Sequence, residues 1–221
     1  MKLRLNKIIK YLIYSDLVFY TGWGLISPIF AVFVLNSIIG GSALVVGIAA
    51  SINMITRSMF RIPLGICADK NNKTAFAFMF WGLLLTAFIP IGYSFCSHIW
   101  NIYLLQGLLG ASLAMSTSGW TTIFSRHLDK GKESTEWGID AVAAAGIGPG
   151  IAAAIGGIAV TYFSFKSVFL ASSFIGIIGA FLLLVVRKEI TEHQAQKHVL
   201  HKRLARGIIS HIVNHHRFYK P

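Results

Sequence analysis

Six apolar segments, each long enough to cross a membrane, occupy most of this 221-residue chain. A helix needs roughly 20 apolar residues to cross a hydrocarbon core of about 30 Å. Only helices and closed barrels satisfy their backbone hydrogen bonds in a bilayer, and these runs are too continuous for alternating barrel strands. The sequence therefore predicts an all-α polytopic integral membrane protein with six transmembrane helices, at residues 11–35, 43–67, 74–95, 100–124, 137–163 and 167–186.

The distribution of basic residues predicts how the chain sits in the bilayer. Of 20 Lys and Arg residues, 19 fall before the first span, around the turn after the second, in the turn after the fourth, or after the sixth. Only Lys166 falls in a loop on the opposite side. Because loops rich in Lys and Arg stay cytoplasmic, we expect both termini in the cytoplasm. The net charge of +12 follows from this topology and needs no nucleic-acid partner.

Short loops between the spans predict that neighbouring helices pack antiparallel in one bundle, residues 1–186. Residues 187–221 form a separate basic tail that contains six of the eight His residues. Apolar residues recur every four positions from Leu200 to Ile212, which predicts an amphipathic helix lying on anionic lipid. No cluster of Cys or carboxylate accompanies the tail histidines, so no metal site is expected there.

A polar turn follows the second span and reads GICADKNNKT, from Gly65 to Thr74. A glycine at its start permits close approach of two helices, and Asp69 can face a helix N-terminus. Asn72 tolerates a left-handed backbone conformation. Lys70 and Lys73 hold the turn on the cytoplasmic side.

This turn resembles the signature that members of the major facilitator superfamily of secondary transporters carry between spans two and three. Their pattern is G-x-x-x-D-R/K-x-G-R/K-R/K, and the chain departs from it at two positions. Asn72 replaces the second glycine, and Thr74 replaces the last basic residue. The positions that match are Gly65, Asp69, Lys70 and Lys73.

Spans four and five extend the resemblance. Gln106-Gly107 is similar to the end of the family's R-x-x-Q-G pattern, but Tyr103 stands at the Arg position, which in the family is often linked to proton coupling. The fifth span resembles the family's Gly-Pro motif, in which small residues permit tight helix contact and bending. Its motif residues are Gly146, Gly148, Pro149, Gly156 and Gly157.

The resemblance covers about residues 11–186 and corresponds to the N-terminal half of a two-half fold. In that fold the halves are related by an axis along the membrane normal and enclose the substrate site. It implies a secondary-type transporter that moves a small solute by alternating access, together with a second six-helix half from a homodimer or a partner chain. The alternative is a half-transporter that does not transport, either a gene fragment or a subunit that modulates another membrane protein. The absence of a targeting presequence favours a prokaryotic plasma membrane.

Ionisable residues inside the spans are costly and are therefore functional candidates. All five lie in the cytoplasmic third of the bilayer, where they form either static ion pairs between helices or a gate whose pairs break during transport. We expect Asp69 to pair with Arg126 in the two cytoplasmic turns. We also expect Arg57 or Arg61 to pair with Asp16 or Asp140. The five residues are Asp16, Arg57, Arg61, Glu136 and Asp140.

Polar and aromatic residues at other depths are candidates for lining a cavity: Trp23, Asn53, Gln106, Ser116 and Trp120. Two of these are tryptophans that could stack a ligand, although tryptophan serves equally well in helix packing or near headgroups. An intramembrane serine protease would need a His beside its Ser, and none of the eight His residues lies deep in a span. We therefore expect no enzyme activity. The sequence contains no phosphate-binding loop, and no cofactor is expected.

Overall fold

The computed structural model describes residues 5–190, and this part of the chain contains six helices that are long and apolar enough to cross a membrane. The first span is divided into two helices, and the fifth contains a π-helical segment. In chain order the elements are α1 (Lys7–Ile26), α2 (Phe30–Ser37), α3 (Ala43–Ala68), α4 (Asn72–Tyr93), α5 (Ile99–His127), α6 (Glu133–Asp140), η1 (Ala141–Ile147), α7 (Gly148–Tyr162) and an unlabelled last helix, Phe165–Ile190.

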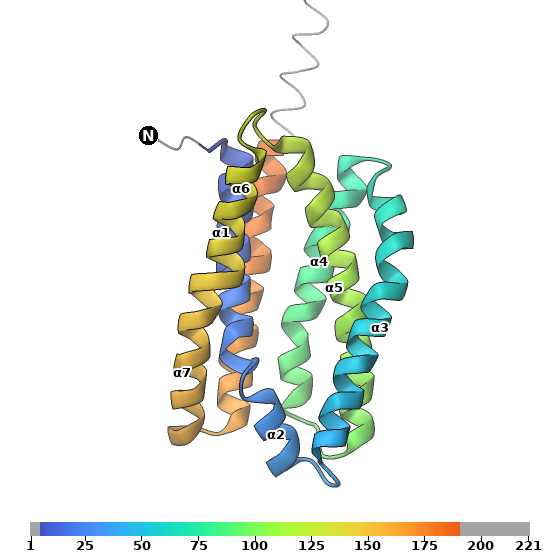
Figure 1. Cartoon of the computed structure of the whole chain (residues 1–221), viewed down its shortest axis with the longest axis vertical. Helices are drawn as coiled ribbons and strands as arrows, with labels where there is room; N and C mark the ends of the chain where they lie inside the picture. The colour runs from blue at the N-terminus through green and yellow to red at the C-terminus, as the bar shows by residue number, and fades with distance from the viewer. Residues whose placement is uncertain (1–4, 191–221) are drawn as a thin grey trace, which may run out of the picture.

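The helices run up and down side by side, as the short loops predict (Figure 1). The start of α1, the α3–α4 turn, the α5–α6 loop and the end of the last helix all lie at one end of the bundle. These are the segments in which the basic residues concentrate, and we refer to this end as the basic end. Within residues 5–190, the fold thus brings to one end of the bundle the basic residues that the sequence distributes over four separate segments.

A break at residues 27–29 divides the first span. Pro28 lies in it, and proline cannot donate the backbone hydrogen bond that a continuous helix requires. Gly22 and Gly24 lie within α1 and allow close packing. A Cβ atom at Gly22 would lie 2.9 Å from the carbonyl oxygen of Ser172 in the last helix. One at Gly24 would lie 2.6 Å from the carbonyl oxygen of Pro149 in α7.

Small residues also bring the other helices together. A Cβ atom at Gly82 of α4 would collide with the backbone of Ser116 in α5, and one at Gly110 of α5 would lie 2.5 Å from the carbonyl oxygen of Asn53 in α3. Such contacts suit a membrane, where association depends on close van der Waals packing rather than on the hydrophobic effect. The contacts of α5 with both α3 and α4 place it between them.

The two cysteines provide a test of the orientation. Cys67 lies near the basic end, and Cys96 lies in the α4–α5 turn at the other end. Burial raises the pKa of the Cys96 thiol to about 11. At neutral pH only a small fraction of Cys96 is therefore the reactive thiolate, and its labelling should accelerate as pH rises towards that pKa.

With Cys67→Ser and Cys96→Ser variants in intact cells, we expect a membrane-impermeant maleimide to label only the variant that retains Cys96. Labelling should be slow at neutral pH and faster at higher pH. Cys67 should react only after the membrane is permeabilised. Labelling of Cys67 from outside intact cells would reverse the orientation that the basic residues predict.

Candidate functional site

The turn between α3 and α4 is the first part of the candidate site. Asp69 caps the C-terminus of α3, and its backbone N–H donates to the carbonyl oxygen of Gly65 over 2.9 Å. Asn71 caps α4 by accepting a 2.8 Å hydrogen bond from the N–H of Thr74. Asn72 is the first residue of α4 and does not use the left-handed conformation that it can tolerate. Asn71 supplies the cap, and α4 therefore starts without a left-handed residue.

Arg126, in the last turn of α5, contacts both sides of this turn. Its Nη1 donates to Asn72 Oδ1 over 2.6 Å, and its Nη2 donates to the Asp69 carbonyl oxygen over 2.7 Å. The same Nη2 lies 4.0 Å from Asp69 Oδ1, so the structure brings together the two residues that the sequence pairs. The Asp69 side chain remains 72% exposed. A pair this exposed contributes little to folding, on the order of 0–1 kcal/mol.

Thr122 is a further member of this site that sequence reasoning missed. Its hydroxyl donates to Asp69 Oδ1 over 3.1 Å and also lies 3.0 Å from the Ser118 carbonyl oxygen in its own helix. Thr122 stands one helical turn before Arg126, so both side chains lie on the same face of α5. The four-residue spacing from Arg126 is the sequence feature that could have identified Thr122 as part of the site.

The other basic residues of the turn lie apart from this cluster. Lys70 and Lys73 are exposed, and neither makes a salt bridge within residues 5–190. Gly65 touches no neighbouring helix, since a Cβ atom there would meet nothing within 4 Å. The close helix approach expected at Gly65 therefore does not occur within this bundle.

Four of the five charged residues inside the spans interact electrostatically with Tyr20 of α1. Asp16 and Asp140 contribute negative charge near its ring, and Arg57 and Arg61 of α3 contribute positive charge. Both aspartates are buried, whereas the arginines are partly exposed. In the described part of the chain, no salt bridge of 4.0 Å or less joins either arginine to either aspartate. These groups of opposite sign are therefore not paired directly in this conformation.

Glu136 is hydrogen-bonded to the backbone and makes no salt bridge to an arginine among the described residues. Its Oε2 accepts a 3.0 Å hydrogen bond from the backbone N–H of Asp129 in the α5–α6 loop. Asn6 Nδ2 donates to Asp129 Oδ1 over 3.1 Å and to the His127 carbonyl oxygen over 2.7 Å. These contacts tie the start of α1 to the loop at the basic end. Glu136 therefore positions this loop.

The fifth span departs from α-helical geometry at the Gly-Pro motif. The π-helical segment η1 includes Gly146, and α7 begins at Gly148 with Pro149 in its first turn. Pro149 cannot donate to a preceding carbonyl, which favours a local change of helix type here. Gly148 lies against Leu17 and Thr21 of α1.

Gly156 and Gly157 follow in α7, on different faces of the helix. A Cβ atom at Gly156 would collide with the carbonyl oxygen of Leu25 in α1. One at Gly157 would meet nothing within 4 Å. The motif therefore combines packing within the bundle with an open small-residue surface on its outside.

The five candidate cavity residues do not converge on one point. Asn53 Nδ2 donates to the Gln106 carbonyl oxygen over 3.2 Å, which links α3 to α5, and Ser116 is buried where α5 meets α4. Trp23 and Trp120 belong to different apolar clusters.

Trp120 belongs instead to an aromatic cluster that joins α5 to α6. It stacks on Phe124 with ring centroids 4.4 Å apart, and it meets Trp137 edge-on at 5.5 Å. Its indole Nε1 is buried and has no hydrogen-bond partner among the described residues. These contacts account for the position of Trp120 without a ligand.

Comparison with known proteins identifies the family to which the sequence is similar. A family model described as the Major Facilitator Superfamily matches residues 13–219. The match includes the α3–α4 turn, Arg126 and the whole fifth span. No curated protein matches the chain.

Proposed function

Because this chain belongs to the Major Facilitator Superfamily, we propose that it moves a small solute across the membrane by alternating access, as one six-helix unit docked on a second. The second unit is a further copy of the chain or another six-helix chain. Alternating access of this type proceeds by rocking one bundle against another around a shared site. The proposal therefore depends on a surface to which a second bundle can bind.

Burial supports such a surface on two of the six spans. In the most apolar stretches of α3 and of the fifth span, 11% and 18% of residues are buried, against 39–50% in the other four. These two spans therefore expose the most side-chain surface to whatever surrounds the bundle. Lipid or a second protein would cover that surface, and the identity of its residues helps to distinguish the two.

The main support for a second unit comes from glycines at which an added Cβ atom would meet no neighbour. Six described glycines would place a Cβ atom in open space, and five of them lie on α3 or on the fifth span. A helix facing lipid gains nothing from glycine, whereas a helix facing another helix gains close backbone approach. We therefore assign both surfaces to contact with a second unit. The five are Gly47, Gly65, Gly138, Gly150 and Gly157.

The charged groups at the basic end suit the closing and opening of such an assembly. Asp69 is exposed next to the open α3 surface, where Thr122 and Arg126 hold its position. Asp16, Asp140, Arg57 and Arg61 stand near one another without a direct salt bridge. We propose that these groups form ion pairs in one state of the transport cycle and separate in another. We place this end in the cytoplasm, by the charge rule.

Transport can be tested before the substrate is identified. Small solutes are screened for those that raise the unfolding temperature of the purified protein, since ligands that bind the native state stabilise it. Each hit is then loaded into proteoliposomes, and counterflow of labelled solute is followed. We expect a stabilising solute to accumulate transiently inside. Binding without counterflow, in an assembly shown to contain two units, would favour a regulatory subunit instead.

A further inference from the structure

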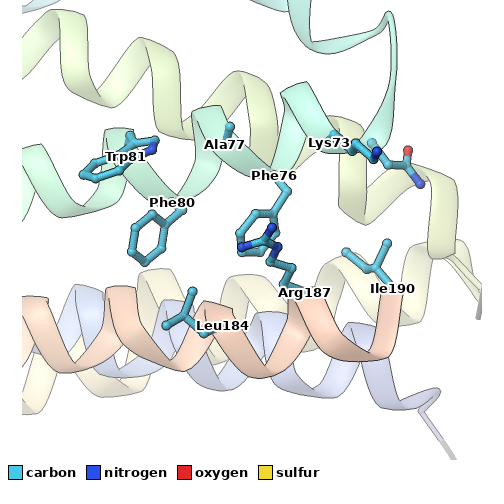
Figure 2. Close-up of a pocket in the computed structure, with 9 residues that line it drawn as sticks. Lys73, Phe76, Ala77, Phe80, Trp81, Leu184, Arg187 and Ile190 are labelled. Carbon is cyan, nitrogen blue, oxygen red and sulfur yellow. The ribbon is translucent and has the colours of Figure 1, made fainter. Parts of the chain in front are cut away.

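A cavity of about 540 Å³ lies between α4 and the last helix. Its lining includes Asn72 and Lys73 from the start of α4, but none of the charged residues around Tyr20 and none of the open glycines. We call it the α4 groove. Figure 2 shows Lys73 and Ile190 at one end of it and Trp81 at the other. Phe80 and Leu184 face one another across the groove, and Arg187 extends from the last helix towards Phe76.

The polarity of the α4 groove changes along its length. Lys73 and Arg187 supply two positive charges near the basic end. Trp81 lies eight residues beyond Lys73 on the same helix, which corresponds to about 12 Å further along it. Phe76, Phe80 and Leu184 make the part nearer Trp81 apolar. No Asp or Glu lines the groove among the described residues.

Aromatic contacts hold this shape. The Phe76 and Phe80 rings are nearly parallel, at 11°, with centroids 6.3 Å apart, and Phe80 meets Trp81 edge-on at 5.3 Å. The Arg187 guanidinium lies 5.9 Å from the centroid of the Phe76 ring, which places a cation where the aromatic wall begins. Trp81 is 55% exposed although it lies well below the charged end of its helix. The wall is therefore built from rings in mutual contact and is accessible at Trp81.

We propose that the α4 groove binds an anionic phospholipid, with the phosphate between Lys73 and Arg187 and an acyl chain along Phe80, Trp81 and Leu184. A cationic end followed by an apolar wall matches a phospholipid in both charge and order along the membrane normal. A soluble anion would leave the aromatic wall uncovered, and a lipid without net charge would interact less strongly with two cations. Basic pockets between transmembrane helices are recognised sites for anionic headgroups.

The chain's own C-terminal tail is a poorer occupant of the groove. Residues 191–221 contain six Lys or Arg residues and one carboxylate side chain, so their charge has the same sign as that of the groove. Like charges close together disfavour docking. This lipid site goes beyond the proposed transport and can be tested independently of it.

The first experiment is native mass spectrometry of the full chain in detergent, titrated with phosphatidylglycerol or phosphatidylcholine. We expect phosphatidylglycerol to bind more tightly. A Lys73→Gln/Arg187→Gln variant should lose about 30-fold in affinity for it, from the typical contribution of two basic residues near a membrane surface. The control, Lys130→Gln/Lys188→Gln, removes the same charge from the same end outside the groove and should bind as the wild type does. Equal loss in both variants would overturn the site.

Two further experiments identify which molecule occupies the α4 groove. Inorganic phosphate should fail to displace phosphatidylglycerol, because it cannot cover the aromatic wall; full displacement would mean a soluble-anion site. A photoreactive benzoylphenylalanine at position 81 of the full chain should cross-link to phospholipid. Cross-links to residues 191–221 instead would show that the tail occupies the groove, and would overturn the proposal.

Discussion

Replacing Gly156 by leucine should strongly destabilise the bundle, whereas the same replacement at Gly157 should leave its stability unchanged and block its docking on a second unit. At Gly156 even a Cβ atom would collide with the Leu25 carbonyl oxygen, so α7 must move away from α1. At Gly157 a Cβ atom meets nothing within 4 Å. The two positions are adjacent and receive the same side chain, so they form a matched pair.

For Gly156→Leu we expect a loss of at least about 3 kcal/mol in the free energy of unfolding, the upper part of the range for overpacking. For Gly157→Leu we expect a change within about 0.5 kcal/mol, as for a position away from packed neighbours. Thermal unfolding of the detergent-solubilised variants measures both. A Gly156→Leu protein as stable as the wild type would contradict the α1–α7 packing.

The effect of Gly157→Leu on docking is measured separately from its effect on stability. Native mass spectrometry of Gly157→Leu in nanodiscs should show the single chain, because leucine prevents the close backbone approach that glycine permits. If Gly157→Leu assembles and transports as the wild type does, the surface around Gly157 has no part in docking. A Gly131→Leu variant is unsuitable as a control, because Gly131 has a φ of +80° that strains other residues.

Asp69→Asn should reduce transport by about 10-fold to 100-fold without a change in folding or insertion. The carboxylate is 72% exposed, and its Arg126 partner lies at 4.0 Å, so the pair contributes little within this unit. Its exposed position leaves it free to accept a hydrogen bond from the second unit. Hydrogen bonds to charged groups contribute about 1.5–3 kcal/mol, which corresponds to the expected change in rate.

Two further variants refine this prediction. Thr122→Val keeps the side-chain shape but removes the hydroxyl that lies 3.1 Å from Asp69 Oδ1, so its effect should be in the same direction and smaller. Glu189→Gln serves as the control, because it removes a carboxylate from the basic end that pairs with Lys7 over 3.7 Å, outside the turn. The measurement is counterflow in proteoliposomes with equal amounts of inserted protein. Wild-type transport by Asp69→Asn would exclude the turn from the mechanism.

Composition and periodicity predict the larger part of this fold. Six long apolar runs imply six helices, because a bilayer leaves few alternatives, and the basic residues identify the segments that share one end. The proximity of Asp69 and Arg126 was also predictable, because both turns were expected at that end. These inferences depend on local composition and on the direction of the chain.

Other features depend on contacts between helices that the sequence does not specify. Nothing in the run from Ala141 to Ile147 indicates a π-helix, which depends on how Gly148 and Pro149 pack against α1. Trp120 was a plausible cavity residue by depth, but Phe124 and Trp137 enclose it. Likewise, the sequence shows Gly156 and Gly157 as equivalent, and only the structure separates the packed glycine from the open one.

The most direct test of the central claim is the mass of the wild-type protein in nanodiscs formed from native lipid. If a second unit docks on α3 and the fifth span, native mass spectrometry should show an assembly heavier than one 24.3 kDa chain, either at twice that mass or at the sum of this chain and another. A single 24.3 kDa species, retained over a range of protein-to-lipid ratios, would contradict the claim that this bundle functions as half of a two-unit transporter.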